Sequence, residues 1–381
     1  MINCIFDLSN MLFRSMFSVT AYGSKQFTFN TQEECDILLR KVTMDISYIM
    51  RSISPSRVVF ALDNSSWRKK IKIEENEGYK GNREKSKNLN WDNIYKASDE
   101  FSEIMDSNGY IVTKIDGAEG DDIITLWTNE LHKNQHQHVI IVSGDEDIRQ
   151  LVNYDKIDDK YSFVTVFNPF TQGKGASKKL YHSKYFNEWL TTEDVCNIFN
   201  LTIDVDKEDF KKLQKLDKVK FEETDGNLIK MRKIFCGDDG DNIPSIFTWI
   251  KNDKEVRFTN SKFEKLLEVI GNDCDHVKVL EKADIVLENI KLLTKEIPVF
   301  NIKERLNRQI KLIVLDPNVF PSDIVNEFEK IKTIELKKPK TNNAAVNMHQ
   351  LLSNTRYVTT KQNNKSTIFN ELDRMNNKSL F

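Results

Sequence analysis

Short apolar runs alternate with helical patterns along the first 170 or so residues of the chain. The runs are rich in β-branched and aromatic residues, which is typical of strands buried on both faces. Four runs lie at 2–6, 58–62, 110–112 and 139–142, with a fifth candidate at 163–167. Helical patterns lie between them, for example at 33–52 and 91–107. The alternation predicts an α/β fold with a mostly parallel central sheet and helices on both faces.

The pattern changes twice towards the C-terminus. Apolar positions are spaced as in a helix from about 243 to 335, and after Pro339 the chain is rich in Asn, Thr and Ser. A polar insertion also separates the second strand from the next helix, at about 64–90. We therefore expect an α/β domain, a smaller helical region and a disordered tail, at 1–240, 241–338 and 339–381.

Composition excludes several classes of protein. Five cysteines lie far apart without a CxxC pair, which is typical of reduced thiols in a cytoplasmic protein. No run of about 18 apolar residues is present, so no membrane span is expected. The net charge of −2 argues against a nucleic-acid binder, but the charges are segregated. Single acids follow apolar runs, whereas lysines and arginines gather in separate segments.

Acidic residues stand where three of the predicted strands end. The first strand ends at Asp7, the second at Asp63, and the run at 139–142 leads into Ser143-Gly144-Asp145-Glu146-Asp147. In an open parallel sheet, ligands bind at the carboxyl edge, where these ends meet. Two further acidic groups, at 119–122 and 238–241, could reach the same place.

Nine carboxylates would repel one another strongly in one cleft unless cations neutralised them. Oxygen ligands suit Mg²⁺ or Mn²⁺, and the lack of matched His and Cys argues against zinc. Two such ions about 3.5–4 Å apart can activate a water and stabilise the leaving oxygen of a phosphodiester. The nine acids are Asp7, Asp63, Glu119, Asp121, Asp122, Asp145, Asp147, Asp238 and Asp241. The alternative is that each acid merely caps a helix or opens a turn.

Five acid motifs occur in the order found in the 5′ nuclease superfamily, which the chain resembles over roughly residues 1–270. They are Ile5-Phe6-Asp7, Ala61-Leu62-Asp63, Glu119-Gly120-Asp121-Asp122, Ser143-Gly144-Asp145-Glu146-Asp147 and Gly237-Asp238-Asp239-Gly240-Asp241-Asn242-Ile243-Pro244. The likeness is strongest to the ribonuclease H type of T-even phages. It implies a PIN/5′-nuclease-like fold with two Mg²⁺ ions, for which Mn²⁺ can substitute. One ion would be held by Asp7, Asp63, Glu119, Asp121, Asp122 and Asp145, and the second by Asp147, Asp238 and Asp241.

The insertion at 64–90 is basic, and the resemblance places it in an arch that admits a 5′ end or flap. Cations beside a metal site can stabilise charge on phosphoryl oxygens in the transition state. We expect Arg68, Lys80 and Arg83 to clamp phosphate, and Tyr79 to stack on a base. Glutamates interleave with these cations, so a solvated loop of mixed charge is the alternative.

Further lysines and arginines are candidates for contacts with the nucleic-acid backbone. The family usually shows a glycine-containing loop after the last acid motif that grips duplex, often with a monovalent ion. Here the expected Gly-x-Gly is missing after Pro244. We expect backbone contacts from Lys174, Lys178, Lys179, Lys251, Lys254, Arg257 and Lys262. Plain solvated surface is the alternative for the lysines near 174–179.

The chain ends in Ser379-Leu380-Phe381, an apolar anchor on a polar tail. Leu380 and Phe381 resemble the short peptides that replication proteins insert into sliding clamps. The alternative is a frayed, unbound terminus. A sliding clamp and a single-stranded-DNA-binding protein are therefore candidate partners.

The resemblance implies a 5′→3′ exonuclease or flap endonuclease with ribonuclease H-like activity. Its substrate would be branched DNA or an RNA–DNA duplex, and its role primer removal in phage DNA replication in the host cytoplasm. Hydrolysis would proceed by in-line attack of a water activated by the metal ions. Two alternatives are a Toprim-like phosphotransfer enzyme built on Asp145-Glu146-Asp147 and a catalytically inactive, structure-selective DNA-binding protein.

Overall fold

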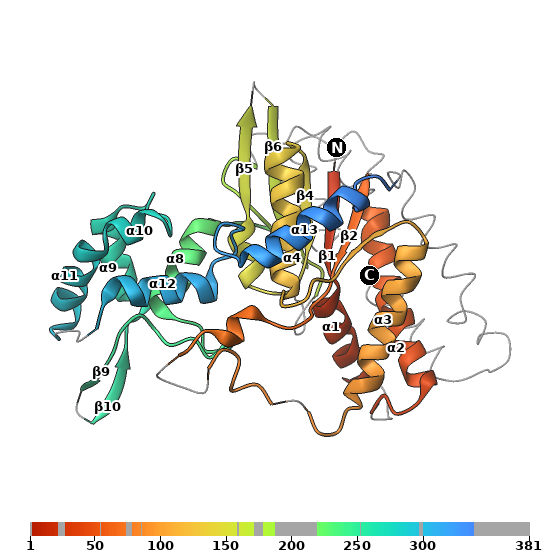
Figure 1. Cartoon of the computed structure of the whole chain (residues 1–381), viewed down its shortest axis with the longest axis horizontal. Coiled ribbons are helices and arrows are strands. Elements are labelled where there is room, and N and C mark those ends of the chain that lie inside the picture. Colours follow the sequence, from red (N-terminus) through yellow and green to blue (C-terminus); the bar gives the residue numbers. More distant parts are fainter. Residues whose placement is uncertain are drawn as a thin grey trace.

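A central β-sheet organises the protein in the computed structural model, shown in Figure 1. The structure describes residues 2–21, 27–53, 55–73, 78–84, 86–157, 160–170, 178–186, 219–251, 253–296 and 300–338. The strands of the sheet are β1 (Ile2–Asp7), β2 (Arg57–Ala61), β3 (Ile111–Thr113), β4 (His138–Val142), β5 (Asn153–Ile157), β6 (Lys160–Asn168), β7 (Lys178–His182) and β8 (Val219–Glu223).

The sheet is mostly parallel, which confirms the prediction. Its order is β3-β2-β1-β4-β6-β7-β8, and every neighbouring pair from β3 to β6 is parallel. β7 pairs with β6 in the antiparallel sense, as does β5, which lies off the main path. β1 therefore lies between β2 and β4, the two strands whose C-terminal ends lead into further acids.

Helices follow the strands and then form a separate group. The first set is α1 (Leu8–Ala21), α2 (Gln32–Ile53), α3 (Trp91–Ser107) and α4 (Gly120–Thr128). The second set is α8 (Gly226–Cys236), α9 (Asn260–Ile270), α10 (Lys278–Glu281), α11 (Ala283–Thr294), α12 (Ile302–Ile313) and α13 (Ser322–Glu335). Among the helices of these described segments, none is long and apolar enough to cross a membrane.

Alternate residues of each central strand enter two different cores. Phe6 and Phe60 pack with α1, α2 and α3 on one face of the sheet, and their rings stack at 5.4 Å. Ile5 and Val59 face the other way and pack with α4. This period-two burial on both faces is the reason the strands read as continuous apolar runs rather than as alternating ones.

A third core holds the helical region together. It is made by α8, α9, α11 and α12 and includes Phe235, Phe263 and Leu306. The helical pattern predicted from 243 to 335 is wrong at its start, because β9 (Thr248–Lys251) and β10 (Lys254–Arg257) form an antiparallel hairpin there. The period-two alternation of polar and apolar residues in β9 and β10 is too short to be distinguished from the helical spacing of the apolar residues in α9, which follows. Figure 1 shows this hairpin projecting from the helical region.

The last described helix returns to the sheet. α13 lies across α4 in Figure 1, and the Phe328 ring meets the Trp127 ring edge-on at 5.1 Å. Lys332 of α13 also forms an ion pair of 3.1 Å with Glu130. α13 thus belongs to the same core as Ile5 and Val59, although it follows the helical region in sequence. The domain division near residue 240 stays a prediction.

The docking of α13 can be measured by truncating its buried ring. We expect Phe328→Ala to lower the free energy of unfolding by roughly 3–5 kcal/mol, because it leaves a cavity against Trp127. Ile334→Ala on the same helix is the matched control, since Ile334 is 65% exposed and Phe328 only 2%. Denaturant titration should show a clear loss for the first variant and little for the second. Equal losses would contradict the packing described for α13.

Candidate active site

Three carboxylates converge at the C-terminal edge of the central strands. Asp7 is the last residue of β1 and pairs in register with Ala61 of β2. Asp63 follows β2 by two residues, and Asp145 follows the end of β4 by three. Because β2 and β4 flank β1, their ends bring these side chains together, as the sequence predicts.

Asp7 is held rigidly. Its Oδ1 accepts a hydrogen bond of 3.0 Å from the backbone N–H of Asn10, and its Oδ2 accepts one of 2.7 Å from the Ser143 hydroxyl. The Ser143 oxygen in turn accepts a 3.0 Å bond from the backbone N–H of Asp145. Ser143 thereby fixes Asp7 and Asp145 relative to each other across the β1–β4 boundary.

Asp63 is tied to the start of α4. Its Oδ1 accepts a 2.6 Å hydrogen bond from the backbone N–H of Gly120, at the positive end of that helix. A Cβ at position 120 would lie only 3.0 Å from the same oxygen, so glycine allows this approach. The next residue, Asp121, lies near Asp7 and Asp145.

Burial and electrostatic repulsion together disfavour the charged form of these carboxyl groups. Burial, and then the charges of Asp63 and Asp145, raise the pKa of Asp7 to about 7. Burial, and then the charges of Asp145 and Asp7, raise the pKa of Asp121 well above its ordinary value, while Lys80 lowers it. We call Asp7, Asp63, Asp121 and Asp145 the acid cluster. It concentrates negative charge that its protein neighbours offset only in part.

The chemistry of the acid cluster fits a hard divalent cation. All its donors are carboxylate oxygens. Because the pKa values of Asp7 and Asp121 are raised, these groups hold protons more readily than ordinary carboxyl groups, and a divalent cation could displace those protons. Within the described residues, no three acidic, His or Cys side chains approach closely enough to form a ready-made metal site. The fit is therefore one of donor type and charge, and ligation would require the carboxylates to draw together.

Glu119 and Asp122 are paired with a buried arginine rather than with the acid cluster. Arg68 is 2% exposed, and its guanidinium lies 3.2 Å from Glu119 Oε2 and 2.8 Å from Asp122 Oδ1. It also lies over the Trp67 ring at 4.7 Å, and the Trp67 N–H donates a 3.1 Å hydrogen bond to Asp122. Arg68 was predicted to clamp phosphate, but in this arrangement its charge is enclosed by protein.

Tyr79, Lys80 and Arg83 connect Glu119 to Asp241. The Tyr79 hydroxyl lies 2.9 Å from a carboxylate oxygen of each. Lys80 pairs with Glu119, and Arg83 pairs with Asp241. Burial alone would raise the pKa of Glu119, but Lys80 and Arg68 hold it below its ordinary value. Tyr79 was predicted to stack on a base, yet its ring is buried here.

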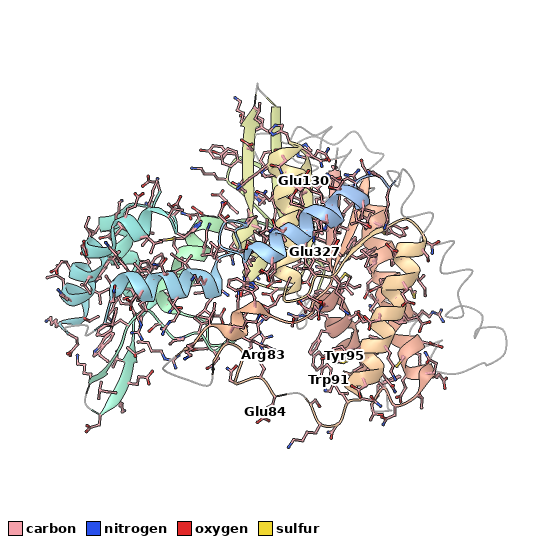
Figure 2. The ribbon with its side chains drawn as sticks, viewed as in Figure 1. Arg83, Glu84, Trp91, Tyr95, Glu130 and Glu327 are labelled. Atoms are coloured by element: carbon pink, nitrogen blue, oxygen red, sulfur yellow. The ribbon has the colours of Figure 1, made fainter. Side chains whose placement is uncertain are left out.

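The basic insertion is docked on the last acid motif through backbone contacts. The N–H of Lys80 donates to the carbonyl of Asp241 at 2.8 Å, and the Asn242 amide donates to the carbonyl of Gly78 at 2.8 Å. The Asn82 amide adds a 3.0 Å bond to the carbonyl of Asp239. Figure 2 shows Arg83 on the segment that runs from the helical region towards α3.

Asp147 and Asp238 share a lysine. Lys233, near the end of α8, forms an ion pair with Asp147 and lies 2.5 Å from Asp238 Oδ2. Burial alone would raise the pKa of Asp238, but the contact with Lys233 holds this pKa below its ordinary value. The three acids predicted for a second ion are thus all paired with protein cations, since Asp241 is paired with Arg83.

The remaining candidate residues lie elsewhere. On β7, Lys178 lies over the Tyr48 ring at 4.4 Å and Lys179 pairs with Glu222 at 3.1 Å. Arg257 pairs with Asp239 and Glu255, whereas Lys262 lies over the Trp249 ring at 5.2 Å. Lys251 and Lys254 are exposed on the hairpin. Lys174, Leu380 and Phe381 lie outside the described residues.

Sequence reasoning missed several residues that shape the site. Ser143 was noted only as part of a motif, although it bonds both Asp7 and Asp145. Lys233 carried no signal, because a lysine in a last helical turn is ordinary. The ring of Phe320 lies 5.8 Å from the Arg68 guanidinium, and no local pattern could reveal that contact.

Comparisons with known proteins give a family match and a shared fold. Residues 3–188 match the family described as 5′-3′ exonuclease, N-terminal resolvase-like domain. No curated protein sequence matches the chain. A bacteriophage T5 5′-exonuclease with bound divalent zinc ions is 16% identical with a TM-score of 0.51, covering 89% of this chain and 100% of its own.

A second solved structure gives the same result. It is the bacteriophage T5 flap endonuclease in a pseudo-enzyme-product complex with DNA and metal ions, which is 16% identical with a TM-score of 0.50. The match covers 88% of this chain and 100% of that one. At this identity the likeness shows a shared fold.

The raised pKa of Asp7 predicts how stability depends on pH in metal-free buffer. The ordinary pKa is 3.8 and the folded pKa about 7, so the folded state binds more protons between these values. Asp7 therefore destabilises the fold increasingly as pH rises from about 4 through about 7. We expect Asp7→Asn to raise the free energy of unfolding at pH 8, on the order of a few kcal/mol, and to have much less effect at pH 4.

The matched control is Asp253→Asn, because Asp253 is exposed in the hairpin turn and keeps a left-handed backbone that asparagine tolerates. Denaturant titrations of both variants at several pH values, with EDTA present, make the comparison. A gain for Asp7→Asn that did not change with pH would contradict the repulsion described for the acid cluster.

Proposed function

Because residues 3–188 match the family described as 5′-3′ exonuclease, N-terminal resolvase-like domain, we propose that the chain is a divalent-metal-dependent 5′ nuclease. It hydrolyses phosphodiesters at the 5′ ends of branched or RNA-primed DNA. The observation that carries the proposal is the convergence of Asp7, Asp121 and Asp145 from three separate elements, where burial and then the neighbouring carboxylates raise the pKa of Asp7 and of Asp121. Such a group is unfavourable in a folded protein unless it binds cations.

The acid cluster is proposed to hold the first divalent ion, with Mg²⁺ as the physiological ion and Mn²⁺ as a substitute. When bound, such an ion supplies Lewis-acid activation of water and stabilises the leaving oxygen. Asp147, Asp238 and Asp241 are proposed to hold the second. For that, Lys233 and Arg83 must release carboxylates they now neutralise. The bacteriophage T5 relatives that bind zinc or other metal ions support the proposal.

The cations around Glu119 have two proposed roles. Lys80 and Arg83 are partly exposed, and transferring their contacts from carboxylate to phosphate would place positive charge against the phosphoryl oxygens. Arg68 is fully enclosed, so we propose that it positions Glu119 and Asp122 instead of touching substrate. Tyr79 acts with it by fixing Glu119 against Asp241.

The proposed substrate and setting are supported by the same family match and by the solved structures that share the fold. The bacteriophage T5 flap endonuclease bound to DNA supports a DNA duplex with a 5′ end as the substrate class. Removal of RNA primers during phage replication is the proposed role. A sliding clamp docked on Leu380 and Phe381, and a single-stranded-DNA-binding protein, are the proposed partners.

Neither alternative function accounts for the geometry as well. A Toprim-like enzyme would use the acids at 145–147 but has no role for Asp7 and Asp63, which the fold brings to Asp145. An inactive DNA-binding protein would gain nothing from keeping four repelling carboxylates together.

Removing one carboxylate should separate chemistry from binding. We expect Asp145→Asn or Asp63→Asn to lower the rate of cleavage by more than about 100-fold, because even outer contacts of a metal site are worth roughly 10–100-fold. Affinity for DNA should stay nearly unchanged. The measurement is cleavage of labelled flap, nicked and RNA-primed duplexes in Mg²⁺, with binding measured in parallel.

The control for that experiment is Asp284→Asn, an exposed acid on α11 away from the sheet edge. Labels at the 5′ and at the 3′ end distinguish exonuclease from endonuclease products. Cleavage at the wild-type rate by Asp145→Asn would refute the proposed site.

Lys233 gives a test of the second ion. We expect Lys233→Met to raise the affinity for Mn²⁺ by roughly tenfold, about 1.4 kcal/mol, because it leaves Asp147 and Asp238 without their ammonium partner. Isothermal titration calorimetry without DNA makes the measurement. Arg232→Met carries the same charge change on the exposed side of α8 and should leave the isotherm as it is. Identical isotherms for both variants would count against a second ion there.

A further inference from the structure

The first turn of α1 lies beside the two loops that bring Asp63 and Asp145 to Asp7. β1 ends at Asp7 and is flanked by β2 and β4, and α1 begins at the next residue, Leu8. The Asp7 carboxylate accepts the backbone N–H of Asn10 at 3.0 Å, which is the hydrogen bond of a helix N-cap. The carboxylate at the centre of the acid cluster therefore also fixes the start of this helix.

Two side chains of this turn accept backbone N–H groups from those loops. The Ser9 hydroxyl oxygen accepts a 2.9 Å hydrogen bond from the N–H of Asp63. The Asn10 side-chain oxygen accepts a 3.1 Å bond from the N–H of Gly144, the residue before Asp145. Ser9 thus connects the loop after β2 to α1, and Asn10 connects the loop after β4 to it. We call Ser9 and Asn10 the first-turn acceptors.

The loop after β4 approaches α1 closely at Gly144. A Cβ at this position would lie 3.1 Å from Asn10 Oδ1 and 2.9 Å from Cδ2 of Phe170, so glycine allows the approach. Glycine also leaves a loop backbone free to adopt many conformations when nothing restrains it. The hydrogen bond to Asn10 supplies a restraint directly before Asp145.

Carboxylates that repel one another separate unless their backbones are held. Burial, and then the charges of Asp63 and Asp145, raise the pKa of Asp7. Loops that were free to move would therefore carry these two acids away from Asp7. A divalent cation needs the opposite, because the oxygen ligands of Mg²⁺ lie only about 2.0–2.1 Å from the ion. A hydrogen bond to a backbone N–H restrains each loop without using a carboxylate oxygen.

We propose that Ser9 and Asn10 are positioning residues for the acid cluster. By holding the loops after β2 and β4 against α1, they set the distances of Asp63 and Asp145 from Asp7, and so the affinity for a divalent cation. This inference rests on the proposed function in taking a divalent cation as the ligand. The alternative is that the first-turn acceptors only stabilise the fold, since Ser and Asn are favoured near helix starts.

The test measures Mn²⁺ binding without substrate, from the electron paramagnetic resonance signal of the free ion. We expect Asn10→Ala and Ser9→Ala each to weaken binding of the first ion by roughly 10–100-fold, as the loss of groups that orient metal ligands does. Ser9→Thr keeps a hydroxyl acceptor and should bind Mn²⁺ as the wild-type protein does. Equal weakening by Ser9→Thr and Ser9→Ala would contradict the proposal, because only the second lacks the acceptor.

Ser15→Ala is the matched control, because it removes a buried hydroxyl from the same helix. Ser15 is 1% exposed, and its hydroxyl donates a 3.5 Å hydrogen bond to Asp45 of α2. Denaturant titration in EDTA gives the stability of each variant. Both Ser15→Ala and Asn10→Ala are expected to lower the free energy of unfolding, but only Asn10→Ala should weaken Mn²⁺ binding. Equal Mn²⁺ affinity for these two variants would overturn the proposal.

The dependence of cleavage on Mn²⁺ concentration gives a second measurement. Asn10→Ala keeps every carboxylate, so it should reach the wild-type maximal rate but need more Mn²⁺ to reach half of it. Asp145→Asn lacks a ligand and should stay slow at every Mn²⁺ concentration. A lower maximal rate for Asn10→Ala with an unchanged Mn²⁺ requirement would contradict the positioning role.

The same measurements separate this inference from the proposed function. If the wild-type protein bound no Mn²⁺, or if Asp145→Asn bound it as tightly as the wild type, the proposed function would fail. If Asp145→Asn weakened Mn²⁺ binding and Asn10→Ala did not, the proposed metal site would stand and only the role of the first-turn acceptors would be refuted.

Discussion

Repulsion between carboxylates at one edge of a parallel sheet is the constraint on which this structure depends. Parallel strands direct their C-terminal ends to the same side, so Asp7, Asp63 and Asp145 meet there whatever the rest of the chain does. The fold accommodates the crowding through Ser143, the Asn10 N–H and the Gly120 N–H, which all donate to these acids or bridge them. Burial and the remaining repulsion from Asp63 and Asp145 still raise the pKa of Asp7.

Protein cations balance the outer acids, and they all come from segments that follow the strands. Arg68 and Lys80 form ion pairs with Glu119, and Arg83 forms one with Asp241. Lys233 forms ion pairs with both Asp147 and Asp238. The site therefore has an inner group without full compensation and an outer ring that is internally neutralised. Because the inner acids carry more uncompensated negative charge than the outer ones, a divalent cation is expected to bind the inner group first. Substrate phosphates can compete with the outer acids for the protein cations that neutralise them.

The sequence could predict the sheet and the acid cluster because both depend on local pattern. Apolar runs locate β1, β2 and β4, and an acid that follows each run is placed by the strand itself. It could not predict that Tyr79 and Arg68 are buried, because their partners come from distant segments; Tyr79 and Asp241 are 162 positions apart. The hairpin at 248–257 was missed because its strands have only four residues each, fewer than a period-two pattern needs to be distinct.

The helical region is attached to the sheet at both of its ends. At one end, Lys233 of α8 forms an ion pair with Asp147. At the other end, the Gln150 side-chain N–H donates to the Ile313 carbonyl at 3.2 Å, and the Gln150 side-chain oxygen accepts from the Leu315 N–H at 2.9 Å. A segment anchored twice cannot swing as a hinged lobe would. We therefore expect a nucleic-acid strand to enter when the 78–83 segment separates locally from the site. This requires Tyr79 to break its hydrogen bonds, while the surrounding helices and sheet keep their positions.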